Sequence, residues 1–162
     1  WNLKLFAGRL GANCLRVADL VPGTTYSVEA RDSVTCAPEL SRLILNLAYT
    51  HLDPNAGVYP GRRLVYGGLT FSMAGAQTTR ALGNLVTIVS WLGLDHTGPV
   101  FEGDVLRTDV TVEAIHPITD GALLVLRAIT YAEREADSTR REPGSPVQET
   151  PVLDWRFVAL AV

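Results

Sequence analysis

The second half of the chain contains several runs in which apolar and polar residues follow a strand-like pattern. Over 105–115, apolar residues such as Leu106 and Val110 alternate with polar residues such as Arg107. This alternation predicts a strand with one face exposed to solvent. The run 85–96 is almost wholly apolar and rich in β-branched residues, which predicts a strand buried on both faces. Further apolar strands are predicted at 122–132, after an Asp120-Gly121 hairpin turn, and at 152–162, with a solvated, mobile loop over 133–150 between them.

A different pattern occupies the middle of the chain, over 64–82. Leu69, Met73 and Ala76 recur at helical spacing after the pair Gly67-Gly68, which predicts a helix enclosed on nearly every side by a curled sheet. Backbone N–H groups in the first turn of a helix are unpaired, and glycine lets a ligand approach them closely. The start of this helix is therefore a candidate site for an anion or a polarised carbonyl. The alternative is that its small residues serve helix packing alone.

Upstream of that helix the pattern predicts one strand and one more helix. The strand covers 24–31, where polar and β-forming residues alternate. The helix covers 35–50, because Pro38 suits a first turn and an apolar face follows at helical spacing. That face consists of Leu40, Leu43, Ile44, Leu47 and Ala48. Residues 1–23 are interpreted as a lead-in or interdomain linker, and the order of elements favours an antiparallel α+β fold.

Composition narrows the classes of function. At 162 residues the chain suits one domain, and its net charge of −3 and pI of about 5.6 argue against a nucleic-acid partner. No signal peptide or membrane span is visible, so no membrane partner and a cytoplasmic location are expected. Three histidines and no Cys-x-x-Cys predict no metal site. Cys14 and Cys36 are interpreted as buried thiols in preference to a disulfide.

Three segments together resemble the MaoC-like branch of the hotdog fold, which includes the (R)-specific enoyl-CoA hydratases. Asn46-Leu-Ala-Tyr-Thr-His51-Leu-Asp-Pro resembles the family's Asp-x4-His followed by Leu-Asp-Pro. Leu64-Val-Tyr-Gly67-Gly68 stands where the family commonly has Val-His-Gly before its central helix. Gly98-Pro-Val-Phe-Glu-Gly-Asp104 resembles the Pro-Val-Phe-x-Gly-Asp that leads into a long strand.

The resemblance implies a hotdog domain over 24–162, in which an antiparallel sheet wraps a hydrophobic helix. It implies an acyl-CoA thioester as substrate, with coenzyme A as part of that substrate and no separate cofactor. Active sites of the family lie where two such units meet. The expected partner is therefore an identical subunit in a homodimer or a second hotdog domain in the same polypeptide.

The resemblance also implies which residues form the site. His51 matches the catalytic histidine, and Gly67 matches the glycine whose N–H binds the thioester carbonyl, beside Gly68. Asn46 stands where the family has Asp, and an amide cannot accept a proton at neutral pH. It is therefore expected to orient a water or His51 without replacing the base. Tyr66, in place of the commoner His, either points its hydroxyl into the pocket or packs.

Several other residues are candidates for substrate binding. Asp53 follows His51 in a turn, where capping of its own backbone is the competing interpretation. Asp95 and His96 end the strand predicted after the central helix, and either reaches the cleft or the two satisfy one another. The three arginines Arg62, Arg63 and Arg80 are either ligands for the phosphates of coenzyme A or solvated surface residues.

These observations leave two leading functions open. The first is hydration of a trans-2-enoyl-CoA or the reverse dehydration. The second is a non-catalytic half that keeps the fold and the acyl pocket while a partner half supplies Asp and His. Thioesterase action ranks last, because it wants a carboxylate on the central helix and none occurs from Leu64 to Leu82.

Overall fold

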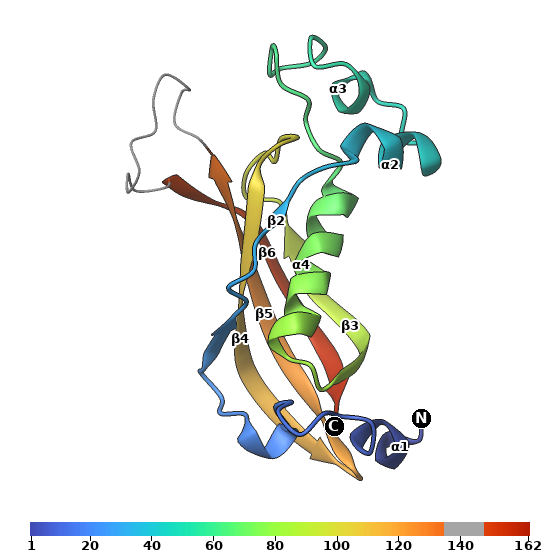
Figure 1. The fold of residues 1–162 in the computed structure, drawn as a ribbon, viewed down its shortest axis with the longest axis vertical. Helices are drawn as coiled ribbons and strands as arrows, with labels where there is room; N and C mark the ends of the chain where they lie inside the picture. The colour runs from blue at the N-terminus through green and yellow to red at the C-terminus, as the bar shows by residue number, and fades with distance from the viewer. Residues whose placement is uncertain (135–147) are drawn as a thin grey trace.

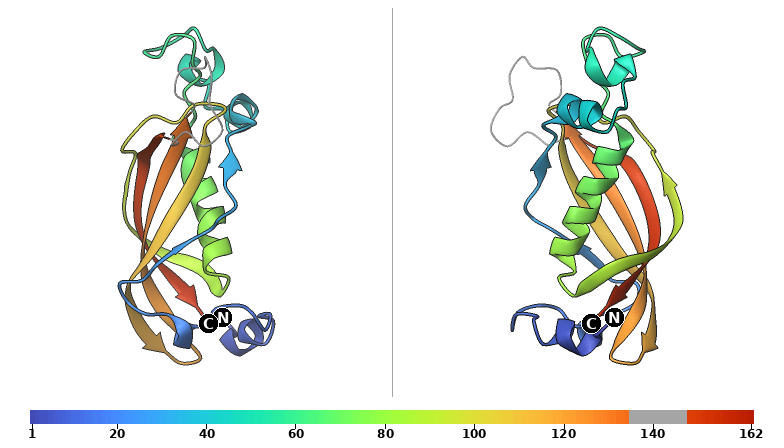
Figure 2. Two further views of the ribbon diagram at one scale, coloured as in Figure 1. Left: turned by 60° about the vertical axis from the view of Figure 1, so that its left-hand side comes forward. Right: turned by 90° about the vertical axis from the view of Figure 1, so that its right-hand side faces the viewer.

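A computed structural model of the chain describes residues 1–134 and 148–162. One antiparallel sheet curls around a single long helix, α4, in the views of Figures 1 and 2. The helices are α1 (Leu3–Ala7), α2 (Ala37–Leu43), α3 (Tyr49–Leu52) and α4 (Gly67–Ala81), with a short 3₁₀ helix at Val17–Asp19, and the strands are β1 (Thr25–Ser27), β2 (Asp32–Ser33), β3 (Leu85–Asp95), β4 (Val105–Ile118), β5 (Gly121–Arg134) and β6 (Gln148–Ala161). The predicted α+β class is confirmed.

The three long strands β4, β5 and β6 form the centre of the sheet. The strand order is β1-β4-β5-β6-β3, and β2 also pairs with β4. Burial alternates along β4 and β5 as the sequence pattern predicts, because successive side chains of a strand point to opposite faces. Asp120 adopts a left-handed conformation (φ 64°) in the predicted hairpin turn between them. The strands expected at 105–115, 122–132 and 152–162 are therefore confirmed.

Helix α4 packs against the concave face of this sheet through one side. Thr70, Ala74, Gln77 and Thr78 are buried, and the core beneath them includes the stacked rings of Trp155 and Phe157. The opposite side of the helix carries exposed residues such as Ser72, Ala76 and Thr79. The prediction that the helix is enclosed on nearly every side is therefore wrong, because the sheet covers only one side of it.

A buried glutamine connects α4 to the neighbouring strands. The Gln77 side-chain amide donates hydrogen bonds to the Asp32 carboxylate (2.7 Å) and to the Leu106 carbonyl (2.9 Å). The Arg80 guanidinium also binds Asp32. Burial opposes the charged form of Asp32, but these two hydrogen-bonding partners hold its pKa below the ordinary value. The short strand β2 is thereby fastened to the helix.

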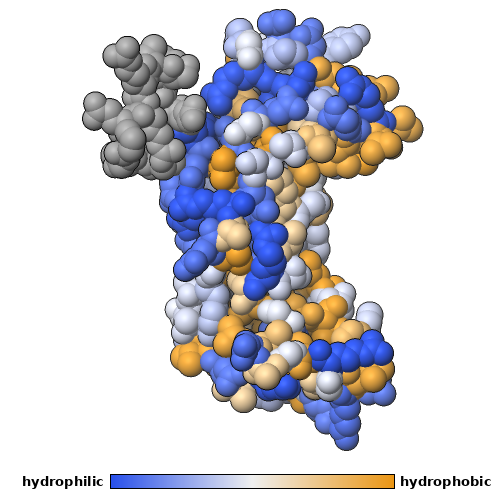
Figure 3. Space-filling view, in the orientation of Figure 1, coloured by the Kyte–Doolittle hydropathy of each residue, from blue (hydrophilic) through white to orange (hydrophobic). Residues whose placement is uncertain are grey.

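The helix predicted over 35–50 is broken into α2 and α3. Leu45 lies between them with a left-handed backbone (φ 59°), which ends the first helix. The predicted apolar face is exposed, with Leu43 at 81% and Leu47 at 56% exposure, and α2 carries an apolar patch in Figure 3. The predicted helical face is therefore wrong, because the helix ends at Leu43, Leu47 lies in the non-helical link, and the buried residues of α2 are Ala37, Pro38 and Ser41.

The strand predicted over 24–31 is also shorter than expected. Within this range only Thr25–Ser27 (β1) forms a strand, and the two-residue strand β2 begins just beyond it at Asp32; the two pair with different parts of β4.

Strand β3 lies at an edge of the sheet. It pairs with β6 alone, with three register shifts, and its residues Ile88, Val89, Trp91 and Leu92 are 40–51% exposed. The prediction that this strand is buried on both faces is therefore wrong. Its apolar composition resembles that of a central strand, but in the described part of the chain it has a neighbour on one side only.

The first twenty-three residues pack against the bottom of the sheet in Figure 1. Leu3 forms a small cluster with Leu160 and Val162, and Leu20 belongs to the main core. Cys14 and Cys36 are free thiols, so the two are not paired, but Cys36 is exposed and the prediction of a buried thiol is wrong there.

Part of the predicted loop 133–150 lies outside the described residues, at 135–147. Its two ends belong to strands β5 and β6, so the prediction of a loop is wrong at 133–134 and 148–150. Among the residues described, no helix has the length and apolar character needed to cross a membrane.

A hydroxyl pair in the sheet core provides a test of the strand register. Thr108 and Thr130 face each other across β4 and β5, both buried, with their hydroxyl oxygens 2.9 Å apart. Replacing one by Val leaves the other hydroxyl without its partner, so each single variant is expected to lose about 1–3 kcal/mol of unfolding free energy. The double variant should lose clearly less than the sum.

Denaturant unfolding of the four proteins measures this coupling. The control is the same cycle at Thr25 and Thr111, a cross-strand pair of similar length (2.8 Å) with Thr25 exposed. The coupling energy between Thr25 and Thr111 should be smaller, because water can form a hydrogen bond with the hydroxyl group that remains in each single variant. Equal coupling at both pairs would contradict the buried register.

Candidate active site

The start of α4 is formed by two glycines against which aromatic rings pack. A Cβ added to Gly67 would lie 2.5 Å from the His96 Nε2 atom, and a Cβ added to Gly68 would overlap the Tyr66 ring. Only glycine permits both contacts at these positions. Within the described residues, no backbone hydrogen bond engages the N–H of Gly67 or Gly68, as expected for the first turn of a helix. Two donors are therefore available at this helix start.

A cavity of about 390 Å³ opens beside Gly67. It lies between α3, the first turn of α4 and the segment 96–100 that follows β3. Its lining combines two imidazoles with apolar and small residues: His51, Tyr59, Leu64, Val65, Gly67, Thr70, His96, Thr97, Gly98, Pro99 and Val100. The predicted residues His51, Gly67 and His96 thus meet at one cavity.

The orientation of His51 is fixed by a backbone hydrogen bond. Its Nδ1 atom lies 2.8 Å from the Leu64 carbonyl oxygen. Because a carbonyl only accepts, Nδ1 carries the proton and the neutral ring keeps the Nε2 lone pair. The ring also meets Tyr66 edge-on, with centroids 6.1 Å apart. His51 is therefore held in one orientation, with Nε2 not used by this hydrogen bond.

His96 and Asp95 occupy different positions although they are neighbours in sequence. His96 packs on the Gly67 backbone and lines the cavity. Asp95 is exposed at the end of β3, in register with Asp154 of β6, and is not part of the lining. Of this pair, only the imidazole reaches the site.

Asn46 lies on the other side of Tyr66 from the His51 cavity. It lines a second, more open cavity of about 520 Å³ together with Tyr66, Gly68, Phe71 and Ser72. Its backbone N–H donates to the Ser41 carbonyl (2.9 Å). Tyr66 therefore packs between two cavities, with its ring against Gly68. Asn46 and His51 do not line the same cavity.

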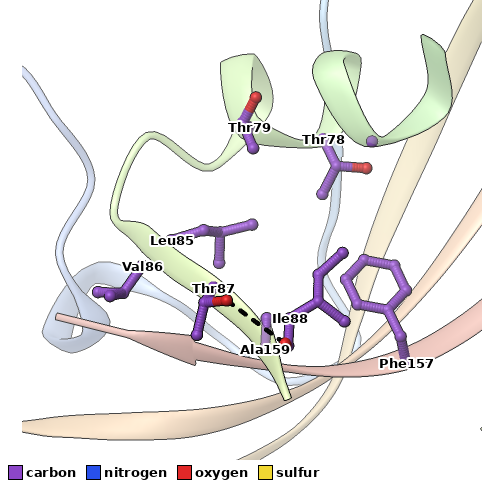
Figure 4. Close-up of a pocket in the computed structure, with 9 residues that line it drawn as sticks. Thr78, Thr79, Leu85, Val86, Thr87, Ile88, Phe157 and Ala159 are labelled. Carbon is purple, nitrogen blue, oxygen red and sulfur yellow. Dashed lines mark hydrogen bonds between the residues drawn. The ribbon is translucent and has the colours of Figure 1, made fainter. Parts of the chain in front are cut away.

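A third cavity, of about 70 Å³, lies between the second half of α4 and strands β3 and β6 (Figure 4). Gly75, Thr78 and Thr79 of the helix face Leu85–Ile88 and Phe157. The hydroxyls of Thr78 and Thr79 donate to helix carbonyls at 2.8 Å, so the lining offers mainly carbon atoms. This space is apolar.

Of the remaining candidates, Asp53, Arg63 and Arg80 are paired away from the cavity, whereas Arg62 lies near it. The Asp53 carboxylate accepts the Asn55 backbone N–H (2.8 Å), which is the turn-capping arrangement, and Asp53 lines neither of the two larger cavities. Arg63 binds Glu102 and the Leu52 carbonyl, and Arg80 binds Asp32. Arg62 stacks on Phe101 near the first cavity, with its Cζ atom 3.6 Å from the ring centroid.

The structure adds cavity residues that the sequence did not indicate. Thr70 follows Gly67 by one helical turn, so its position could be inferred from the helical period. Tyr59 reaches the cavity from the turn-rich segment before α4, and no local pattern marks it. Among the described residues, no group of three or more metal-ligating side chains gathers at this site or elsewhere.

Comparison with known proteins gives structural relatives. No family model matches the sequence, and no curated protein matches it. A conserved hypothetical protein from Mycobacterium tuberculosis, described as essential for survival during infection and as having a double hotdog fold, is 40% identical with a TM-score of 0.79; the alignment covers 100% of this chain and 45% of that one.

Two further structures extend this likeness. A putative MaoC domain dehydratase from Chloroflexus aurantiacus is 25% identical with a TM-score of 0.76, covering 99% of this chain and 47% of that one. An R-hydratase from Pseudomonas aeruginosa is 17% identical with a TM-score of 0.64, covering 89% and 83%, and supports the fold alone. The chain spans about half the length of the first two relatives.

Substitution of Gly67 tests the contact between the helix start and His96. Gly67→Ala places a methyl group where the His96 ring packs, so the ring must move while the fold persists. The expected result is a change in the His96 imidazole signals in an NMR spectrum, with those of His116 unchanged. The protein contains three histidines, so the assignment is direct.

Gly75→Ala is the matched control on the same helix. A Cβ there meets only the Trp155 ring at 3.7 Å or more, and alanine favours a helix over glycine by about 1 kcal/mol. It should leave the His96 signals unchanged. Unchanged His96 signals in Gly67→Ala would contradict the described packing.

Proposed function

Because this chain belongs to the MaoC-like hotdog family, we propose that it binds an acyl thioester and acts in hydration of an enoyl thioester or the reverse dehydration. The observation that carries this proposal is that imidazole side chains and the start of α4 line the same cavity. His51, whose Nε2 is not used by the bond to Leu64, lines this cavity, and so does Gly67, whose backbone N–H belongs to the first turn of α4. A base and an oxyanion donor are the parts that water addition requires.

In the proposed arrangement, the thioester carbonyl oxygen accepts a hydrogen bond from the N–H of Gly67 or Gly68. Addition of water at the β-carbon pushes electrons onto this oxygen, so a donor placed there stabilises the transition state by about 3 kcal/mol. The missing Cβ atoms let the His96 and Tyr66 rings pack against the backbone here, so the carbonyl would approach the N–H groups from the cavity side. A helix start adds partial positive charge to the same point.

The two imidazoles would carry the protons. His51 Nε2 takes a proton from water as the oxygen bonds to the β-carbon, while its Nδ1–H stays on the Leu64 carbonyl. The α-carbon must then gain a proton. His96, which lines the same cavity against Gly67, is a second group able to deliver it. In this scheme His96 takes the part of the carboxylate that Asn46 lacks.

The open side of α4 offers a path for the acyl chain. Gly68, Ser72, Gly75 and Thr79 follow one another at helical spacing, and this stripe leads from the second cavity to the apolar cavity of Figure 4. Gly75 lies eight residues after Gly67, which is about 12 Å along a helix. An acyl chain on this path would have to pass Tyr66 from the His51 cavity into the second cavity before its end reached the apolar cavity.

A second candidate function is a non-catalytic half that binds the thioester without turnover. It is favoured by the lining of the His51 cavity, in which the described residues include no carboxylate, and by Asn46, which lines the neighbouring cavity. In this case the binding groups of the α4 start serve a site whose acid and base come from a partner unit.

We also propose that a second hotdog unit covers the edge strand β3. An exposed edge eleven residues long with apolar side chains readily pairs with another strand. In the double hotdog relative, the part beyond the aligned 45% is long enough to supply such a unit. An identical second chain would supply the same surface.

An assay of enoyl-CoA hydration tests the first function. The purified protein should convert crotonyl-CoA, seen as loss of enoyl absorbance, and His51→Ala should lower kcat/KM by about 10²–10⁴. His116→Ala is the control, because His116 is exposed near the end of β4. An unchanged rate in His51→Ala would refute the site. Turnover that appears only with Asn46→Asp would support the second candidate.

The oligomeric state tests the partner surface. The protein on its own should sediment as two or more copies, and Leu92→Arg on β3 should shift it towards the monomer, because burying a guanidinium in an apolar interface is costly. Ile118→Arg is the control, since this residue is similarly exposed at the end of β4. A wild-type monomer at micromolar concentration would rule out an identical second chain as this unit.

A further inference from the structure

A compact group of charged residues surrounds Phe101 near the His51 cavity. Two guanidinium groups lie over the buried Phe101 ring. The Cζ atom of Arg62 is 3.6 Å from the ring centroid, and that of Arg134 is 5.1 Å from it. Tyr59, which lines the cavity, meets the same ring edge-on at 5.1 Å. Arg62 is therefore linked to the cavity lining through Phe101, which contacts both Arg62 and Tyr59.

The acidic partner of this group is already satisfied without Arg62. The buried Asp104 carboxylate accepts the Phe101 backbone N–H at 2.9 Å and the Arg134 Nε–H at 3.1 Å. Arg62 approaches it only at 3.7 Å, without a hydrogen bond, and its side chain is 49% exposed. Arg63 is paired with Glu102. In the described part of the chain, the group thus has three guanidinium groups and two carboxylates, and Arg62 is the surplus cation.

Stacking on Phe101 holds the Arg62 guanidinium in place while leaving hydrogen-bond donors available. A guanidinium fixed in this way is well suited to bind phosphate oxygens, because its planar fork matches their geometry and little side-chain entropy is lost. Arg63 and Arg80 differ from Arg62 in that each is already paired with a carboxylate, Glu102 and Asp32 respectively, which offsets its charge. Arg62 is the one of the three candidate arginines left available.

We propose that Arg62 binds a phosphate group of the carrier that delivers the acyl thioester, an inference that rests on the proposed function. The thioester enters the cavity beside Gly67, and its pantetheine arm leaves past Tyr59 towards Arg62. The phosphate is either the one joined to pantetheine or one on the adenosine end of coenzyme A. Both present the same oxygen acceptors to the guanidinium.

Binding measurements with three thioesters test this assignment. Calorimetry compares crotonyl-CoA, crotonyl-phosphopantetheine and crotonyl-pantetheine, of which the last lacks any phosphate. Arg62→Gln should weaken binding of crotonyl-CoA about tenfold or more, because charge-assisted hydrogen bonds are lost. It should leave binding of crotonyl-pantetheine unchanged. A similar loss with crotonyl-phosphopantetheine assigns the phosphate next to pantetheine; a loss with crotonyl-CoA alone assigns the adenosine end.

Arg80→Gln is the matched control, since it removes the same charge from a partly exposed side chain thirteen residues after Gly67, about 20 Å along α4. It should not weaken crotonyl-CoA binding. Equal losses in Arg62→Gln and Arg80→Gln would overturn the assignment, as would a loss of crotonyl-pantetheine binding in Arg62→Gln. The thermal midpoint of Arg62→Gln should stay near that of the wild type, because Asp104 keeps Arg134.

A measurement with coenzyme A that carries no acyl group separates this proposal from the proposed function. Binding of free coenzyme A that Arg62→Gln weakens about tenfold supports the Arg62 assignment even where crotonyl-CoA is not converted. If the wild type binds thioesters but Arg62→Gln binds them equally well, the Arg62 assignment fails and the proposed function stands. If the wild type binds neither free coenzyme A nor any thioester, both fail.

Discussion

The absence of side chains at Gly67 and Gly68 is the constraint on which the proposed site depends. It lets the His96 and Tyr66 rings pack directly on the backbone at the start of α4. Any larger residue would push these rings away and cover the unpaired N–H groups. His51 is held by a different part of the chain, through the Leu64 carbonyl just before this helix. The base and the donors are therefore positioned by the same short segment, 64–68.

The fold explains why this segment is rigid enough to serve as a site. Val65 is buried, and its backbone N–H donates a hydrogen bond to the Val100 carbonyl (2.8 Å). The backbone N–H of Leu64 donates to the Thr50 carbonyl (3.1 Å). Helix α4 then packs on β4, β5 and β6 through its buried side. The site is thus fixed to the sheet, although the region around α2 and α3 projects beyond it (Figure 1). The apolar residues of β3 that are exposed form the surface that we propose a second unit covers.

The sequence pattern predicts those strands and helices whose burial follows a local period of apolar and polar residues. Strands β4 and β5 were predicted because their alternation of apolar and polar residues reports directly which side is buried. The edge position of β3 could not be predicted, since burial of an apolar strand depends on whether a neighbour exists. The break between α2 and α3 was missed because nothing local marks Leu45 as left-handed. The separation of Asn46 from His51 into two cavities follows from that break.

Within the site, the pattern of residues and the resemblance to a family contributed differently. The helical pattern and its glycine pair pointed to the start of α4 as the proposed donor site, and the resemblance pointed to His51; both line one cavity in the structure. His96 was one of two equal candidates at a strand end, and only the three-dimensional arrangement distinguished it from Asp95. Tyr59 and the stacking of Arg62 on Phe101 depend on contacts between segments far apart in sequence. Such contacts leave no periodic signal.

A crystal structure with butyryl-CoA, a saturated thioester that cannot be hydrated, tests the central claim most directly. The account predicts the carbonyl oxygen at hydrogen-bond distance, about 2.7–3.2 Å, from the nitrogen of Gly67 or Gly68. It also predicts the β-carbon facing His51 Nε2. A thioester bound with its carbonyl away from the α4 start, or with His51 turned from the ligand, would contradict it.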